Sequence, residues 1–170
     1  MPCIDGLKDE RPEPVGGNGL STLSPLRVLV VDDDVDTAQS LCGLLETMGC
    51  TAIACNDGPE GLSVADRFDP HLAILDLLMP RMRGCQLVRH LRFREANSLA
   101  LVVCISGCTS LGDQQISVGA GFDAYLVKPI RTDTLAQLVE QAQGLTTNLR
   151  WSGPKRLTTP QELTSLPPPN

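Results

Sequence analysis

The 170-residue sequence has few aromatic residues, only two histidines and no long apolar run. Aromatic side chains make up 3% of the chain, so any buried core must be mainly aliphatic. The longest apolar run, residues 99–105, has the length of a strand, whereas a membrane-spanning helix needs about 20 apolar residues. The first residues carry acids and prolines where a secretory signal carries an apolar block. We therefore expect a soluble cytoplasmic protein that has no membrane partner.

Basic residues are also in deficit, since 14 Lys and Arg face 20 Asp and Glu. The resulting net charge of -6 disfavours a protein that binds nucleic acid through its phosphates, so we expect no nucleic-acid partner. The seven cysteines include no Cys-x-x-Cys pair, and neither histidine lies at ligand spacing from a cysteine. Cys42, Cys85 and Cys104 lie in apolar patterns, which favours small buried thiols.

Between residues 26 and 146 the sequence alternates regularly between two kinds of segment. Short aliphatic or β-branched runs predict strands, and the amphipathic patterns between them predict helices. Such an alternation is typical of an α/β fold in which helices cover both faces of a parallel sheet. The five predicted strands are residues 28–31, 51–55, 72–75, 101–105 and 124–127.

Capping signals and composition define the remaining segments. Asp36 with Gln39, and Asp57 with Glu60, have the spacing of capping boxes at the start of the first and second helices. The fourth predicted helix, residues 112–118, is weakly amphipathic. Residues 1–25 are rich in proline and glycine and predict a disordered leader, while residues 147–170 predict a flexible C-terminal tail.

Polar residues follow four of the predicted strands directly. Asp32 and Asp33 follow the first strand, Asp76 the third, Ser106 the fourth and Lys128 the fifth. Because the ligand site of an open parallel sheet lies beyond the carboxyl ends of its strands, we expect these side chains to converge. Clustered carboxylates repel one another unless a cation joins them, and a set of oxygen ligands favours Mg²⁺.

A divalent metal, a further carboxylate, a lysine and a hydroxyl together suit phosphoryl transfer. Asp76 stands alone after the predicted central strand, so we expect it to be the nucleophile. Asp33 is the expected direct metal ligand, and Asp32 is expected to bind the metal through water. Lys128 would balance the charge of the attacked phosphate, and Ser106 would bond to one of its oxygens.

These residues lie in four motifs that resemble those of the receiver domain of bacterial response regulators. The motifs occupy residues 30–33, 76–84, 105–107 and 125–129, and their order and spacing agree with that family over residues 26–146. The resemblance implies a flavodoxin-like (βα)5 doubly wound fold. It also implies a single-domain phosphoacceptor in a two-component or phosphorelay system.

The same resemblance implies the chemistry and the partners. A histidine kinase or histidine phosphotransfer protein would donate a phosphoryl group to Asp76, with Mg²⁺ as cofactor. The backbone carbonyl of Leu78 would be a further metal ligand. Ser106 and Tyr125 would report the phosphate to the surface, and Pro129 would follow Lys128 in a cis peptide bond as a structural residue.

The output is expected to be contact with a downstream protein target, because no DNA-reading or catalytic segment is evident in the sequence. A homodimer through the fourth helix, fifth strand and fifth helix is a further possibility. The protein is not expected to be an enzyme beyond catalysing its own Mg²⁺-dependent phosphorylation and slow autodephosphorylation. Slow loss of phosphate is expected because Leu78 and Cys108 stand where fast-cycling relatives carry polar side chains.

Three alternatives stay open at this point. The chain could be a receiver detached from a hybrid sensor kinase, with its leader as a former linker. It could be a small Mg²⁺-dependent phosphohydrolase with an aspartate nucleophile, although Leu78 stands where such enzymes carry a second acid. It could be a phosphate-free interaction module, against which the complete set of acids and lysine counts.

Overall fold

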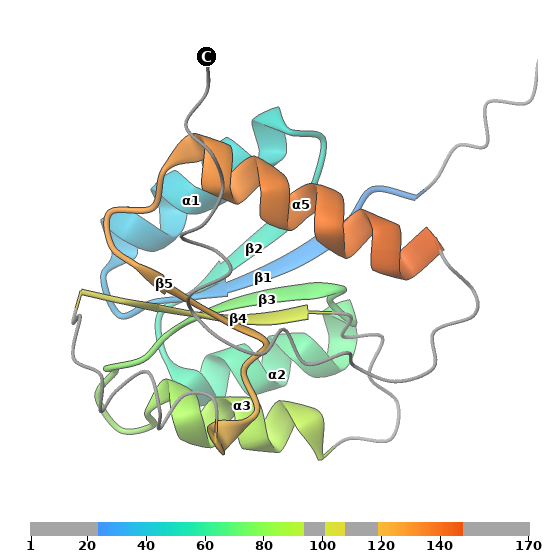
Figure 1. The fold of residues 1–170 in the computed structure, drawn as a ribbon. Coiled ribbons are helices and arrows are strands. Elements are labelled where there is room, and N and C mark those ends of the chain that lie inside the picture. The colour runs from blue at the N-terminus through green and yellow to red at the C-terminus, as the bar shows by residue number, and fades with distance from the viewer. Residues whose placement is uncertain (1–23, 94–100, 108–118, 148–170) are drawn as a thin grey trace, which may run out of the picture.

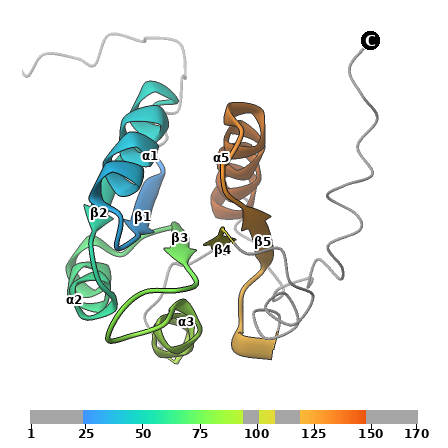
Figure 2. The same ribbon diagram turned by 90° about the vertical axis from the view of Figure 1, so that its left-hand side faces the viewer.

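A computed structural model describes residues 24–93, 101–107 and 119–147. The elements in these ranges are β1 (Arg27–Val31), α1 (Val35–Thr47), β2 (Thr51–Cys55), α2 (Gly58–Phe68), β3 (Leu72–Asp76), α3 (Gly84–Arg92), β4 (Leu101–Ser106), β5 (Ala124–Val127) and α5 (Thr132–Thr147). The strands form one parallel sheet in the order β2-β1-β3-β4-β5. Helices α1 and α5 cover one face and α2 and α3 the other (Figure 1), and Figure 2 shows the sheet between these two layers.

This architecture confirms the predicted α/β fold with helices on both faces of a five-stranded parallel sheet. Each strand begins and ends within one residue of its predicted bounds. The predicted fourth helix, residues 112–118, lies outside the described residues, and so do nearly all of the predicted leader and tail. None of the described helices is long and apolar enough to cross a membrane.

The core is aliphatic and lies in two layers, one on each face of the sheet. Along β1, Val28 and Val30 pack under α1 and α5, whereas Leu29 and Val31 pack under α2 and α3. This alternation follows from the two-residue period of a strand. Every residue of β3 and β4 is buried, as expected for strands covered on both faces. Phe122 is the one aromatic residue that is buried in the described part of the chain.

Helix caps confirm one sequence prediction and correct another. The side chain of Asp57 accepts a hydrogen bond from the Glu60 N–H at 2.8 Å and caps α2, as predicted. The predicted cap at Asp36 is wrong, because Asp34 has the extended backbone of an N-cap and accepts from the Thr37 N–H. Asp36 instead lies inside the first turn, where a negative charge still favours the helix N-terminus.

Among the described residues, four of the five cysteines are buried. Cys42 and Cys104 are buried as predicted, but Cys85 is half-buried. Burial, and then the negative charge of Glu46, raise the pKa of the Cys42 thiol to about 11. A thiol with so high a pKa stays protonated at neutral pH, so Cys42 acts as a small apolar side chain.

His71 is half-buried at the edge of the sheet opposite the strand-end acids. Its Nδ1 accepts a hydrogen bond from the Arg27 N–H at 3.1 Å. The Arg27 side chain in turn pairs with the carboxylate of Asp69 at 3.0 Å. Burial and then the charge of Arg27 lower the pKa of His71, and the charge of Asp69 opposes them. His71 is therefore held neutral, with Nδ1 as an acceptor.

Lowering the pH should therefore weaken the fold at His71. The unfolded chain takes up a proton near the ordinary pKa of about 6.5, while the folded chain resists it, so the unfolded state binds more protons below that pH. The free energy of unfolding should fall as the pH drops from 7 to 5. In His71→Asn, the Asn Oδ1 can replace the Nδ1 acceptor without titrating, and the fall should be smaller. Urea unfolding at both pH values measures this, and equal falls in the two proteins would contradict it.

Candidate functional site

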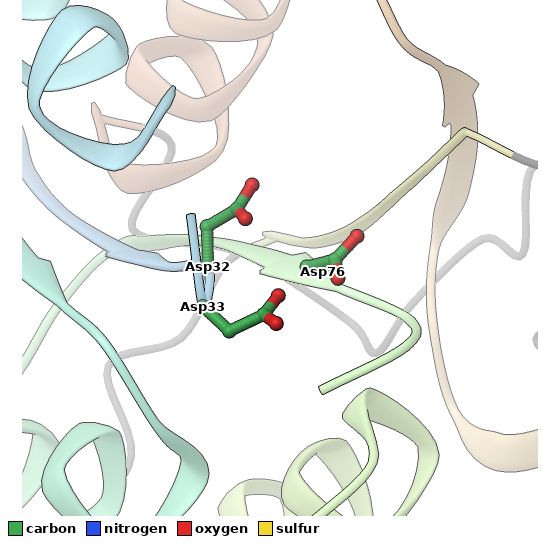
Figure 3. Close-up of side chains that lie close together, drawn as sticks. All are labelled: Asp32, Asp33 and Asp76. Carbon is green, nitrogen blue, oxygen red and sulfur yellow. The ribbon is translucent and has the colours of Figure 1, made fainter. Parts of the chain in front are cut away.

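Three carboxylates meet at the carboxyl edge of the sheet. Asp32 and Asp33 follow β1 directly, and Asp76 is the last residue of β3. Strands β1 and β3 are neighbours whose register brings these ends together. Each of the three side chains offers one oxygen, and these oxygens lie within 4.8 Å of one another. Figure 3 shows Asp32 and Asp33 leaving the end of β1 toward the end of β3, where Asp76 lies.

The three acids differ in exposure. Asp32 is fully buried and Asp76 is 5% exposed, whereas Asp33 is exposed. One side of the cluster is therefore enclosed by the protein, and the other side is open to solvent.

Lys128 brings a positive charge to the cluster. Its Nζ lies 2.7 Å from Asp32 Oδ2 and 3.2 Å from Asp76 Oδ1. The backbone N–H of Lys128 donates to the carbonyl of Ser106 at 2.8 Å, which ties the end of β5 to the end of β4. Ser106 is buried at that end, and the Lys128–Pro129 peptide is cis, as the family resemblance implied.

Burial and charge set the protonation of the pair formed by Asp76 and Lys128. Burial raises the pKa of Asp76, the neighbouring charges of Asp32 and Asp33 add to this, and Lys128 opposes it. Burial alone lowers the pKa of Lys128, but its bonds and charge interactions with Asp32 and Asp76 outweigh burial and raise it. Lys128 therefore stays charged at neutral pH.

The charge balance of the site leaves room for a cation. One Oδ of Asp32 accepts from the Asp34 N–H at 3.0 Å. Its Oδ2 is bonded to the Lys128 ammonium at 2.7 Å. Three carboxylates against one ammonium leave an excess of negative charge. The cluster offers oxygen ligands alone, which is the donor set that Mg²⁺ prefers, so the residues present fit that ion.

The remaining predicted site residues lie near the same edge. Leu78 is two residues beyond Asp76, with a 53% exposed side chain. Tyr125 is half-buried in β5 and packs against the core layer under α2 and α3. Pro129 is exposed. The roles of the Leu78 carbonyl and of Tyr125 stay predictions, and Cys108 lies outside the described residues.

The sequence reasoning missed how tightly Gly84 packs against the site. The N–H of Gly84 donates to the carbonyl of Leu77 at 3.1 Å. A Cβ at this position would lie 2.3 Å from the backbone oxygen of Asp76. The first residue of α3 therefore touches the backbone of Asp76. A glycine a few residues after a strand-end acid is a signal for such a close approach.

Comparisons with known proteins agree with this geometry. The sequence profile of the response regulator receiver domain matches residues 28–140. An uncharacterised 14.6 kDa protein of Leptolyngbya boryana is 32% identical over 122 residues, which cover 72% of this chain and 93% of that protein. The DNA-binding response regulator MtrA of Mycobacterium tuberculosis is 33% identical over 113 residues. The match covers 66% of this chain but 48% of MtrA, so the chain spans about half the length of that relative.

Solved structures give the same picture. The chemotaxis response regulator CheY4 of Vibrio cholerae superposes with a TM-score of 0.65 at 26% identity, over 70% of this chain and 99% of that one. A CheY-like receiver domain protein from Methanospirillum hungatei superposes with a TM-score of 0.65 at 28% identity, over 73% of this chain and 98% of that one.

A methyl group at position 84 should disturb the site directly. Gly84→Ala places a Cβ against the Asp76 backbone oxygen, and relieving such overpacking typically costs about 1–3 kcal/mol. Gly43→Ala is the matched control, because its Cβ meets nothing within 4 Å inside α1. That substitution should stabilise the protein by about 0.5–1 kcal/mol. Urea unfolding of both variants measures the difference, and equal stabilities would contradict the close contact.

Proposed function

This chain belongs to the family of response regulator receiver domains, and on that basis we propose that it accepts a phosphoryl group on Asp76. Members of the family work in two-component signalling, in which histidine kinases or phosphotransfer proteins and downstream targets are the partners. The proposed donor is a phosphohistidine of such a protein. One observation supports the proposal above the others: Asp76 lies among two further carboxylates and the Lys128 ammonium at one sheet edge.

In the proposed transfer, a carboxylate oxygen of Asp76 attacks the phosphorus in line. The new O–P bond forms while the N–P bond to the donor histidine breaks, and the histidine leaves with the bonding electron pair. The product is an acyl phosphate on Asp76. Mg²⁺ held by Asp32, Asp33 and Asp76 would supply positive charge to the phosphoryl oxygens.

The protein's own groups would perform the rest of the work. The ammonium of Lys128, 3.2 Å from Asp76 Oδ1, is placed to neutralise charge on the transferred group. The hydroxyl of Ser106, at the neighbouring strand end, would bond to a phosphoryl oxygen. Movement of Ser106 and Tyr125 would then shift the population of a two-state surface that a downstream protein reads. We assign no catalytic role toward other molecules, because Leu78 stands where a phosphohydrolase needs a second acid.

Asp76→Asn should abolish phosphorylation. An amide is too weak a nucleophile to replace the carboxylate, so incubation with acetyl phosphate and MgCl₂ should add no phosphoryl group to the variant. Asp34→Asn is the matched control, since asparagine caps a helix as well as aspartate does and this side chain caps α1 outside the cluster. Mass spectrometry of the intact proteins and of their peptides measures the adduct. Phosphorylation of Asp76→Asn, or an adduct mapped to another residue, would contradict the proposal.

The acyl phosphate of the wild-type protein should be long-lived. Leu78 is half exposed beside Asp76, and its apolar side chain has no group that can hold or orient a hydrolytic water. Leu78→Asn supplies such a group and should speed the loss of phosphate in the presence of MgCl₂. The decay of phosphoprotein after removal of acetyl phosphate measures the rate. Loss from the wild type within seconds, with no acceleration in the variant, would count against this explanation.

A further inference from the structure

The loop between β3 and α3, residues 77–83, is fixed at its two ends by the backbone. At its start, the N–H of Leu77 donates to the carbonyl of Ile105 at 3.0 Å and extends the sheet. At its end, Gly84 donates to the carbonyl of Leu77 and lies against the backbone of Asp76. Leu78, whose carbonyl is the proposed further metal ligand, is the second residue of this loop.

Two contacts tie the second half of this loop to the N-cap and first residue of α2. A Cβ at Gly58 would lie 2.7–2.8 Å from the Met82 side chain, so Met82 packs closely on that glycine. Beside it, Arg81 Nη2 lies 2.5 Å from Asp57 Oδ2. The loop and the start of α2 are thus joined by one apolar contact and one ion pair.

Arg81 has a backbone conformation that an arginine rarely adopts. Its φ is 66°, in the left-handed region, where an L side chain is strained and where glycine is the usual residue. The N–H of Met82 donates to the carbonyl of Pro80 at 2.7 Å, and this bond closes a tight turn with Arg81 at its centre, which accounts for the positive φ. The side chain of Arg81 leaves this turn paired with Asp57 at the start of α2.

The Asp57 carboxylate that pairs with the Arg81 guanidinium is also held by the cap of α2. Its Oδ1 accepts a hydrogen bond from the Glu60 N–H at the helix cap, which orders the carboxylate independently of Arg81. The Asp57 side chain is 19% exposed, while that of Arg81 is 72% exposed. Because the acceptor is already ordered by the cap, the pair has a smaller entropic cost than two mobile surface side chains would have.

We propose that Arg81 and Asp57 are positioning residues for the metal site: their ion pair holds the loop that carries Leu78 and thereby raises the affinity for Mg²⁺. This inference rests on the proposed function, because it assumes that the acidic cluster binds the ion. Neither residue touches the cluster. Both act through the backbone of residues 77–83, whose two ends pack on Asp76 and its neighbours.

The test compares variants that remove charge and keep shape. Arg81→Gln keeps most of the side-chain length, and Asp57→Asn keeps the helix cap. Each should raise the Kd for Mg²⁺ by about two- to fivefold, the range expected for a largely exposed ion pair. The double variant should bind Mg²⁺ no more weakly than whichever single variant binds it less tightly, because the same single interaction is lost in all three proteins. Arg81→Lys keeps the charge and should bind nearly as the wild type does.

Titration calorimetry with MgCl₂ gives the affinities, and amide hydrogen exchange of residues 77–83 in metal-free protein gives the mobility of the loop. Exchange should be faster in Arg81→Gln than in the wild type. The difference in Kd for Mg²⁺ between Arg81→Gln and the wild type should also become smaller when NaCl is raised from about 0.1 M to about 1 M, since salt screens an exposed ion pair. Arg27→Gln is the control: it breaks the Arg27–Asp69 pair at the opposite edge of the sheet and should leave the Mg²⁺ affinity unchanged.

Wild-type affinity and unchanged loop exchange in folded Arg81→Gln and Asp57→Asn would overturn the positioning role and leave the proposed function standing. An equal loss of affinity in Arg27→Gln would also overturn it, because any destabilising change would then have the same effect. Failure of the wild-type protein itself to bind MgCl₂ would overturn the proposed function instead, and so the two failures are told apart.

Discussion

The contact between Asp32 and Lys128 is the interaction on which the rest of this edge depends. Asp32 is fully buried, and an ionised carboxylate removed from water is costly unless a partner compensates it. The compensating ammonium comes from the end of β5 and lies 2.7 Å away. The same ammonium reaches Asp76 on β3, one of the two strands that lie between β1 and β5 in the sheet. One lysine thus joins the ends of three strands, and the geometry of the acidic cluster follows from that pairing.

Much of this arrangement was predictable because the strands are nearly continuous aliphatic runs. In a parallel sheet covered on both faces such runs are buried throughout, and polar residues mark where burial ends. Asp32, Asp76, Ser106 and Lys128 each mark such an end, and the parallel direction of the strands brings all of them to one edge. The topology of the sheet is therefore the reason that polar residues far apart in the sequence lie together at one edge.

What the sequence did not predict depends on contacts between segments that pattern reasoning treats separately. Arg81 and Asp57 are 24 positions apart, and their pairing requires α2 to begin beside the loop after β3. The bond from the Arg27 N–H to His71 likewise joins the starts of two strands 44 positions apart. The misplaced cap at Asp36 has another cause: four aspartates stand within residues 32–36, and backbone conformation selects Asp34 among them.

The order in which the chain supplies its charges has a consequence for its synthesis. The buried acid is residue 32 and its counter-charge is residue 128, so nearly the whole domain must leave the ribosome before the two can meet. An N-terminal fragment that folded earlier would have to enclose an uncompensated anion. Folding of the nascent chain before β5 has been synthesised is therefore disfavoured, and the domain is expected to fold as a single cooperative unit.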